Sequence, residues 1–233
     1  MFESDSAGRR IATFAWVMAW VGLVVGQLHA MARHQTLGGR SDLELPLTRA
    51  WSDPARAALR PLLDWGDADL VYVTYGKVWL PVFVAFTLCA FAIRARRRPQ
   101  GFERWAWRIA LVGYCWAVVS VFGDYWTQWT GTTNVLLEIS FVLGLPGLLL
   151  TLLGSSLLGI ALVRNGFRPR VSAWLLAATF PLALVITEVT SMGSVVLPIM
   201  FGFGWAGRRL LVADADVDTP SRVAALGHKQ ASQ

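Results

Sequence analysis

Charged side chains are scarce in this sequence. They make up 15% of its 233 residues, whereas soluble domains carry about 25%. Lysine is nearly absent, with Lys77 and Lys229 the only two. Hydrophobic residues reach 55% and the mean hydropathy is +0.49. This composition argues against a soluble domain and is typical of a multi-pass membrane protein.

Residues that bind metals and redox cofactors are also few. The two cysteines, Cys89 and Cys115, lie in separate apolar runs at different depths, so we expect neither a disulfide nor a shared metal. His29 and His34 are five residues apart, about 140° around a helix, which suits a ligand pair less well than a spacing of four. The third histidine, His228, lies near the C-terminal end. We therefore expect no haem, metal or other cofactor.

The motifs of common catalytic sites are missing as well. The sequence has no phosphate loop, G-x-S-x-G elbow, HExxH or CxxC. Asp214, Asp216 and Asp218 begin like a calcium loop, but Thr219 takes the place of its glycine and Ala225 that of its glutamate. The net charge of +6 comes from short clusters beside apolar runs, so nucleic acid is not an expected partner.

Long apolar runs are what the sequence has in abundance. A helix needs about 20 apolar residues to cross the hydrocarbon layer. The runs predict an all-α, polytopic transmembrane helix bundle with six spans, at residues 11–30, 71–93, 105–123, 137–163, 171–190 and 195–211. Residues 1–211 then form one membrane domain, and residues 212–233 form a disordered tail.

The last two spans come from a single apolar stretch, residues 171–207. As one helix its 37 residues would be about 55 Å long, against a hydrocarbon core of about 30 Å. We expect a break at the polar, glycine-containing residues 191–194. Residues 195–211 are few and contain Pro198, so five spans plus a re-entrant segment is the alternative.

Arginine clusters predict the orientation. They occupy residues 94–104, 164–170 and 208–209, whereas the connection "DYWTQWTGTTN" has no basic residue. Because short positive loops stay in the cytoplasm, both termini are expected there, with the chain in the plasma membrane. Residues 32–70 then form an outer loop. Within it, residues 53–65 predict an amphipathic helix on the membrane surface, with Asp53 as its cap and Pro54 at its first position.

Small residues line one side of the first predicted span. Gly22 and Gly26 form a G-x-x-x-G pair, which lets another helix approach closely. Besides the lipid bilayer, we therefore expect another membrane protein as a partner through Gly22 and Gly26. The apolar stretch is longer than the 7–15 residues or so of a signal peptide core, which favours an uncleaved helix.

Depth along each span can be counted from the flanking arginines. At about 1.5 Å per residue, four ionisable side chains reach one level, about 24–28 Å from the arginines, while Glu138 lies nearer the outer mouth; the four are His29, Lys77, Asp124 and Glu188. The lysine could snorkel to the headgroups and each carboxylate face water, or all five could converge in an outward-facing polar cluster. Both arrangements remain open. An unpaired charge costs only about 3 kcal/mol even at the bilayer centre, so pairing is favourable but not required.

Three segments carry a resemblance: "LLDWGDADLVYVTYGKVWL", "GDYWTQW" and "GFRPRVSAWLLA". They resemble uncharacterised multi-pass membrane proteins common in actinobacteria, and the resemblance implies no particular activity. Our first hypothesis is a non-catalytic partner or assembly protein. The alternatives are a transporter or solute-binding protein that uses the outer polar cluster, and a membrane enzyme acting on a lipid headgroup with Glu188 or Asp124 as base.

Overall fold

The computed structural model describes residues 2–128, 135–190 and 192–212, and every regular element in these ranges is a helix. The first elements are α1 (Phe2–Arg33), η1 (Leu37–Glu44), α2 (Pro46–Ala58), α3 (Arg60–Leu63), α4 (Ala68–Gly76), α5 (Trp79–Arg97) and α6 (Gly101–Val121). They are followed by η2 (Phe122–Trp126), α7 (Val135–Arg164), α8 (Arg170–Ala177), α9 (Thr179–Val189), η3 (Met192–Val196), α10 (Leu197–Gly207) and η4 (Arg208–Val212).

Four helical stretches in the described part are long and apolar enough to cross a membrane. They are Ser6–Arg33, Ala68–Arg97, Gly101–Trp126 and Val142–Arg164. Helices α8 and α9 meet the same criterion together, although their axes are bent by 64°. The predicted class, an all-helical protein with several membrane-spanning helices, is confirmed in this form.

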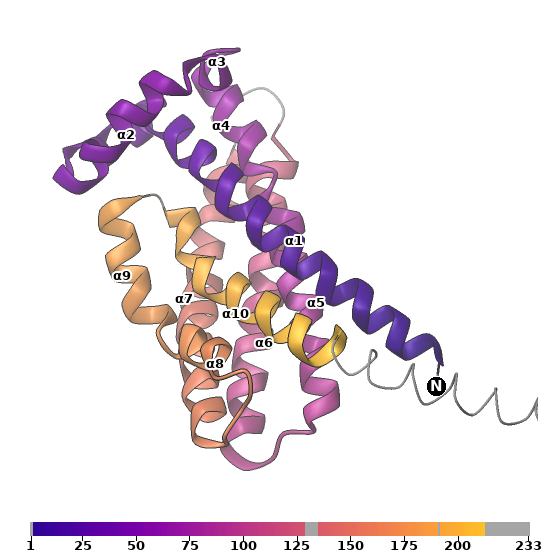
Figure 1. Ribbon diagram of the computed structural model, residues 1–233. Helices are drawn as coiled ribbons and strands as arrows, with labels where there is room; N and C mark the ends of the chain where they lie inside the picture. Colours follow the sequence, from indigo (N-terminus) through magenta and orange to yellow (C-terminus); the bar gives the residue numbers. More distant parts are fainter. Residues whose placement is uncertain (1, 129–134, 191, 213–233) are drawn as a thin grey trace, which may run out of the picture.

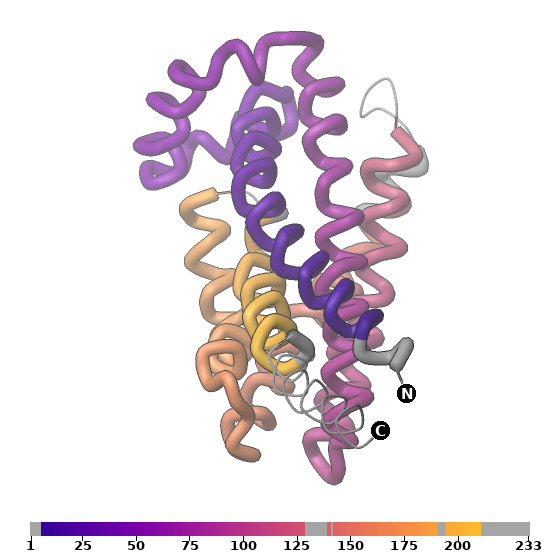
Figure 2. The backbone as a smooth tube through the Cα atoms, turned by 45° about the vertical axis from the view of Figure 1, so that its right-hand side comes forward, coloured from indigo at the N-terminus to yellow at the C-terminus, as the bar shows by residue number. Residues whose placement is uncertain are grey.

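The helices form an elongated bundle with α10 near its centre (Figures 1 and 2). Helix α6 packs along α7, and α10 lies against α1, α5 and α8. Large side chains fill the interior, where Trp107, Tyr114 and Phe203 are fully buried. Because α10 is surrounded by other helices, its sequence is apolar on all sides rather than along one stripe.

The two ends of the bundle differ in chemistry. Residues 34–67, which contain η1, α2 and α3, fold over one end, and we call them the cap (Figure 1). The α5–α6 and α7–α8 connections lie at the other end, which we call the arginine end (Figure 1). The guanidinium of Arg208 lies 5.3 Å from the ring of Trp16, so η4 and the first part of α1 also meet.

The small-residue side of α1 is occupied within the chain. A Cβ atom at Gly22 would lie 2.9 Å from Val82, and one at Gly26 would lie 2.8 Å from Trp79, both on α5. Met200 of α10 lies 3.2 Å from the same point at Gly22. The close helix approach that the glycines predict does occur, but its partners are helices of this chain. This side is therefore not free to bind another membrane protein.

The helix predicted for residues 71–93 begins earlier and is interrupted. Its first part, α4, follows Asp67, and the junction with α5 lies at Lys77. Pro81 has no N–H with which to bond the carbonyl of Lys77. The indole Nε1 of Trp126 donates to that carbonyl instead, at 3.1 Å. The aromatic side chain of η2 thereby satisfies a backbone group that the proline leaves without a donor.

The helix predicted for residues 171–190 is bent rather than straight. Helices α8 and α9 meet at Ala178, shortly before Pro181, which cannot donate to the preceding turn. The amide of Phe180 donates to the hydroxyl of Ser156 on α7, at 2.9 Å. A neighbouring helix thus binds an amide freed at the bend, as a membrane interior requires.

The chain turns between α9 and η3. Helix α9 ends at Val189 and η3 begins at Met192, within the segment where the sequence predicts a break. From residue 192 the helical path continues through α10 to Val212, about 30 Å at 1.5 Å per residue. Beyond Val212, the predicted tail of residues 212–233 lies outside the described residues.

The cap helix predicted at residues 53–65 is wrong at its start. Helix α2 begins at Pro46, which takes the first helical position that the prediction assigned to Pro54. Pro54 lies inside the helix, and Asp53 is 3.5 Å from Arg49 across one turn rather than a cap.

Candidate functional site

A layer of polar side chains lies between the cap and the apolar part of the bundle. His29 of α1 is at its centre. Its ring stacks on the ring of Tyr72 of α4, with 4.6 Å between the ring centres. The ring of Tyr125 lies nearly perpendicular to it, with 5.3 Å between the centres. The indole Nε1 of Trp79 donates to His29 Nδ1 at 3.1 Å. An indole can only donate, so Nδ1 is the acceptor and the ring hydrogen of neutral His29 is on Nε2. That Nε2 is buried without a hydrogen-bond partner.

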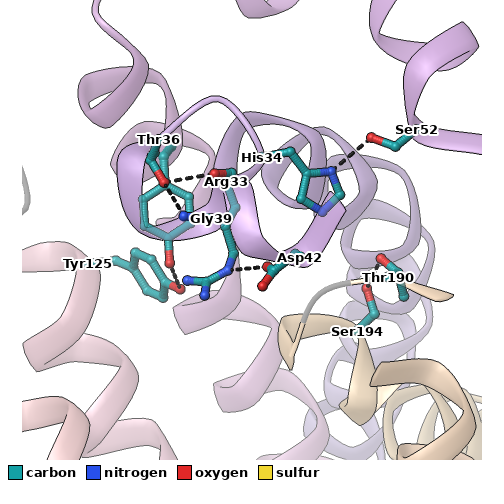
Figure 3. A network of polar contacts seen from close by, with 10 residues as sticks. Arg33, His34, Thr36, Gly39, Asp42, Ser52, Tyr125, Thr190 and Ser194 are labelled. Carbon is teal, nitrogen blue, oxygen red and sulfur yellow. Dashed lines mark hydrogen bonds and ion pairs between the residues drawn. The ribbon is translucent and has the colours of Figure 1, made fainter. Parts of the chain in front are cut away.

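Hydroxyl and guanidinium groups extend this layer toward the cap (Figure 3). The hydroxyls of Tyr72 and Tyr125 are 3.3 Å apart. Arg33, in the last turn of α1, donates from Nε to Asp42 of η1 at 2.8 Å and also interacts with the hydroxyl of Tyr72. The layer therefore joins α1, α4 and η2 to the cap.

Lys77 and Asp124 lie at the edge of this layer, Lys77 at the junction between α4 and α5 and Asp124 on η2. Both are half-buried. The neighbouring η2 residues Tyr125 and Trp126 contact His29 and the Lys77 carbonyl, respectively, so the structure brings His29, Lys77 and Asp124 into one region. The Oδ1 atom of Asp124 is buried without a hydrogen-bond partner.

Glu188 does not belong to this region. It is exposed on α9, and its backbone carbonyl accepts a hydrogen bond from Thr48 of α2 at 3.1 Å. Figures 1 and 2 show α9 and α4 on different sides of α1. The predicted five-residue cluster is therefore divided, because residues at one depth can lie on different sides of a bundle. Glu138 lies on α7, and its side chain is outside the described residues.

A second, neutral polar group lies on the other side of α1. Gln27 Nε2 donates to Ser194 Oγ at 3.4 Å, and Thr190 Oγ1 donates to Gln27 Oε1 at 3.4 Å. Gln27 and His29 are two residues apart, which places them about 200° apart around the helix. Sequence reasoning missed this group because it counted ionisable side chains only.

His34 follows α1 directly and joins this first residue of the cap to α2. Its Nδ1 lies 2.8 Å from the hydroxyl of Ser52 on α2, and both residues are buried (Figure 3). Ser52 has no exposed surface, so a substrate cannot reach this serine–histidine pair. The contact therefore acts as a structural bond between α1 and α2.

Burial also changes the protonation of His34. Removal from water lowers the pKa of this imidazole below its ordinary value of 6.5, and the guanidinium groups of Arg56 and Arg33 act in the same direction. The carboxylates of Asp42 and Asp53 oppose the shift. The folded cap therefore favours the neutral form of His34.

A third polar network lies at the arginine end. Glu103 of α6 is 4% exposed, and it accepts hydrogen bonds from Arg97 of α5, from Trp107 Nε1 at 3.2 Å and from Asn165 Nδ2 at 2.6 Å. The network ties α5, α6 and the end of α7 together. The sequence signal for it was the single glutamate within the arginine cluster of residues 94–104, which sequence reasoning did not single out.

The described residues contain no group of three histidine, cysteine or carboxylate side chains placed to hold a metal ion. His29 and His34, the two histidines considered for such a site, face different partners, Trp79 and Ser52. Ser155 and Ser156 bond to Tyr114 and to the amide of Phe180, which are packing roles. The polar side chains of the layer are thus arranged mainly toward one another.

Comparison with known proteins finds no matching protein family, no matching curated protein and no matching solved structure. The resemblance to multi-pass membrane proteins of actinobacteria stays a prediction.

Proposed function

We propose that this protein is a non-catalytic partner or assembly protein of the plasma membrane, with six membrane crossings and both termini in the cytoplasm. One observation carries the functional part. The polar side chains between cap and bundle bond mostly to one another and to backbone groups, so they hold the cap in place. A cap held in this way offers a fixed surface to another protein.

Two contacts support six crossings. Thr48 of the cap donates to the carbonyl of Glu188, so α8 and α9 together run from the arginine end to the cap. Arg208 lies over Trp16, so α10 and η4 run back to the arginine end. Added to the four long helices, these two segments make six passes. The positive-inside rule then assigns the arginine end to the cytoplasm.

The cap surface supplies sites for a direct test. Leu37 and Leu47 are 83% and 60% exposed on the cap, and Val119 is 70% exposed on the side of α6. A photo-crosslinking residue at either cap position, in membranes of the source cells, should link the chain to one recurrent protein, and the same residue at Val119 should not. The proposal fails if folded chains at native abundance give no recurrent protein adduct from either cap position.

The two buried atoms without a partner, His29 Nε2 and Asp124 Oδ1, favour a second candidate, a transporter or solute-binding protein. Such atoms are costly unless a ligand or water binds them. Purified protein in liposomes would then take up or bind a solute, and Asp124→Asn would reduce this while the exposed Glu188→Gln would not. Equal activity of both variants would exclude the layer as the solute site.

A further inference from the structure

An open groove of about 670 Å³ runs between α5 and α6, outside the polar layer. Its walls are apolar, and two arginines, Arg94 and Arg108, lie at one end. The wall residues are Phe91, Leu111, Val112, Cys115, Trp116 and Val119. Several of them are exposed in a helix that is long and apolar enough to cross a membrane, so the groove faces the lipid.

The groove has the length of one lipid leaflet. From Arg108 to Val119 the helix rises 11 residues, or about 17 Å. Half of the hydrocarbon core is about 15 Å thick. A hydrocarbon chain that entered at the arginines would therefore reach the middle of the bilayer along this wall.

Helix geometry brings the two guanidinium groups toward one level. Side chains in a helix lean toward its N-terminus. Helix α6 begins at the arginine end, so Arg108 leans down toward that end, where its guanidinium lies 5.0 Å from the ring of Trp105. Helix α5 runs the other way, so Arg94 leans up into the groove, and its Nε is buried without a hydrogen-bond partner.

The groove arginines, unlike Arg97, have no carboxylate partner among the described residues. Arg97, one turn beyond Arg94, is bound to Glu103. Within the described ranges no carboxylate lies within salt-bridge distance of Arg94 or Arg108. Two guanidinium groups at the end of an apolar groove complement a negatively charged headgroup attached to a hydrocarbon chain.

We propose that the α5–α6 groove binds an anionic phospholipid of the leaflet at the arginine end. One acyl chain lies along the α6 wall, and Arg94 and Arg108 hold the phosphate of the headgroup. This proposal does not depend on the assembly role, because it concerns a different surface from the cap.

The first test uses the unmodified protein. Purified chain in phosphatidylcholine nanodiscs receives a trace of spin-labelled phosphatidylglycerol or spin-labelled phosphatidylcholine, and the motionally restricted fraction is measured by electron spin resonance. One arginine near the surface is worth about fivefold in affinity, so we expect about 25-fold preference for phosphatidylglycerol from the pair. Equal restriction of the two lipids overturns the proposal, whatever the variants do.

Variants separate this groove from general attraction to a basic surface. The double variant Arg94→Gln/Arg108→Gln should lose the preference, whereas Arg164→Gln/Arg170→Gln removes the same charge at the same end and should retain it. Cys115→Phe fills the groove without changing charge and should reduce binding of both lipids. Equal losses in the two arginine pairs, or no effect of Cys115→Phe in a protein with unchanged helix content, would contradict a groove site.

Discussion

At the scale of single residues, His29 shows how one buried polar side chain connects α1 with three other elements, α4, α5 and η2. It accepts from Trp79, stacks on Tyr72 and meets the edge of Tyr125. Indole and imidazole bury large apolar surfaces and keep one polar contact between them. Trp79 supplies the donor that Nδ1 of the neutral ring needs, while Nε2 is left without a partner.

Removing both partners should therefore cost less than the sum of the two single removals. His29→Leu leaves the buried indole N–H of Trp79 unsatisfied, which we expect to destabilise the fold by about 1–3 kcal/mol. In the double variant His29→Leu/Trp79→Phe the second change should add less than it does alone. Unfolding followed in detergent micelles checks this, and strictly additive effects would show that the hydrogen bond contributes nothing.

The buried imidazole of His34 predicts a pH-sensitive cap. Because burial lowers the folded-state pKa below 6.5, the stabilisation is fully present above pH 6.5 and is lost as pH falls toward the folded pKa. Hydrogen exchange of the α2 amides should therefore accelerate as the pH falls below 6.5. His34→Gln keeps a polar group near Ser52 but cannot titrate, so its α2 amides should show a weaker acceleration once intrinsic exchange is subtracted.

The sequence alone predicted some residues of the polar layer but not all of them. Counting from the arginines predicts height along a helix, and it places His29, Lys77 and Asp124 at one level, where the neighbouring residues Tyr125 and Trp126 contact His29 and the Lys77 carbonyl. It does not predict the side of the bundle, which is why Glu188 was grouped with them although it is exposed on α9. That angle depends on how α9 packs under α2, a long-range contact with no local sequence signal.

At the scale of the elements, the bend between α8 and α9 depends on contacts from α7. The sequence contains Pro181 and so predicts a weak point, but it does not show where the freed amide will find an acceptor. Ser156, 24 residues earlier in the chain, supplies it. Gly159, one turn away on the same helix, lets the backbone at Ala177 approach so closely that a Cβ atom would lie 2.0 Å from its nitrogen.

A methyl group on Gly159 should therefore push α7 and α8 apart. We expect Gly159→Ala to destabilise the fold by about 1–3 kcal/mol or more, because the obstacle is backbone and cannot rotate away. Gly144→Ala, on the same helix, places its Cβ atom 3.4 Å from Ser120 and should change little. Thermal unfolding of the two variants in the same detergent makes the comparison, and similar melting temperatures would contradict the close approach.

At the scale of the whole molecule, apolar length predicted the membrane-crossing helices better than it predicted their ends. The runs are long because the hydrocarbon layer demands it, so they are visible in the sequence. The true ends depend on donors from elsewhere, as at Lys77, whose carbonyl is bound by Trp126 from η2. Helix α10 alone is shorter than a membrane crossing, and its span was predicted only from the excess length of residues 171–207; its position between α1, α5 and α8 explains its composition.

The path of residues 170–212 determines whether the chain crosses six times. Helices α8 and α9 together rise only about 24 Å because of their 64° bend, less than the hydrocarbon thickness of about 30 Å. The end of α9 nevertheless contacts the cap through Glu188 and Thr48. A short, bent helix can reach across if the cap lies close to the membrane surface and the bilayer thins locally by a few ångströms.

Cysteine labelling of intact cells distinguishes this path from a re-entrant one. In a Cys115→Ser background the only native cysteine left is Cys89, which is buried. Labelling then comes only from a cysteine introduced at an exposed position. Ser41→Cys in the cap and Glu188→Cys at the end of α9 should both react with an impermeant maleimide from outside, whereas Arg164→Cys and Arg209→Cys should react only after permeabilisation. If residues 195–211 instead dip into the membrane and return, Arg209→Cys will react from outside in intact cells, while Arg164→Cys will still need permeabilisation.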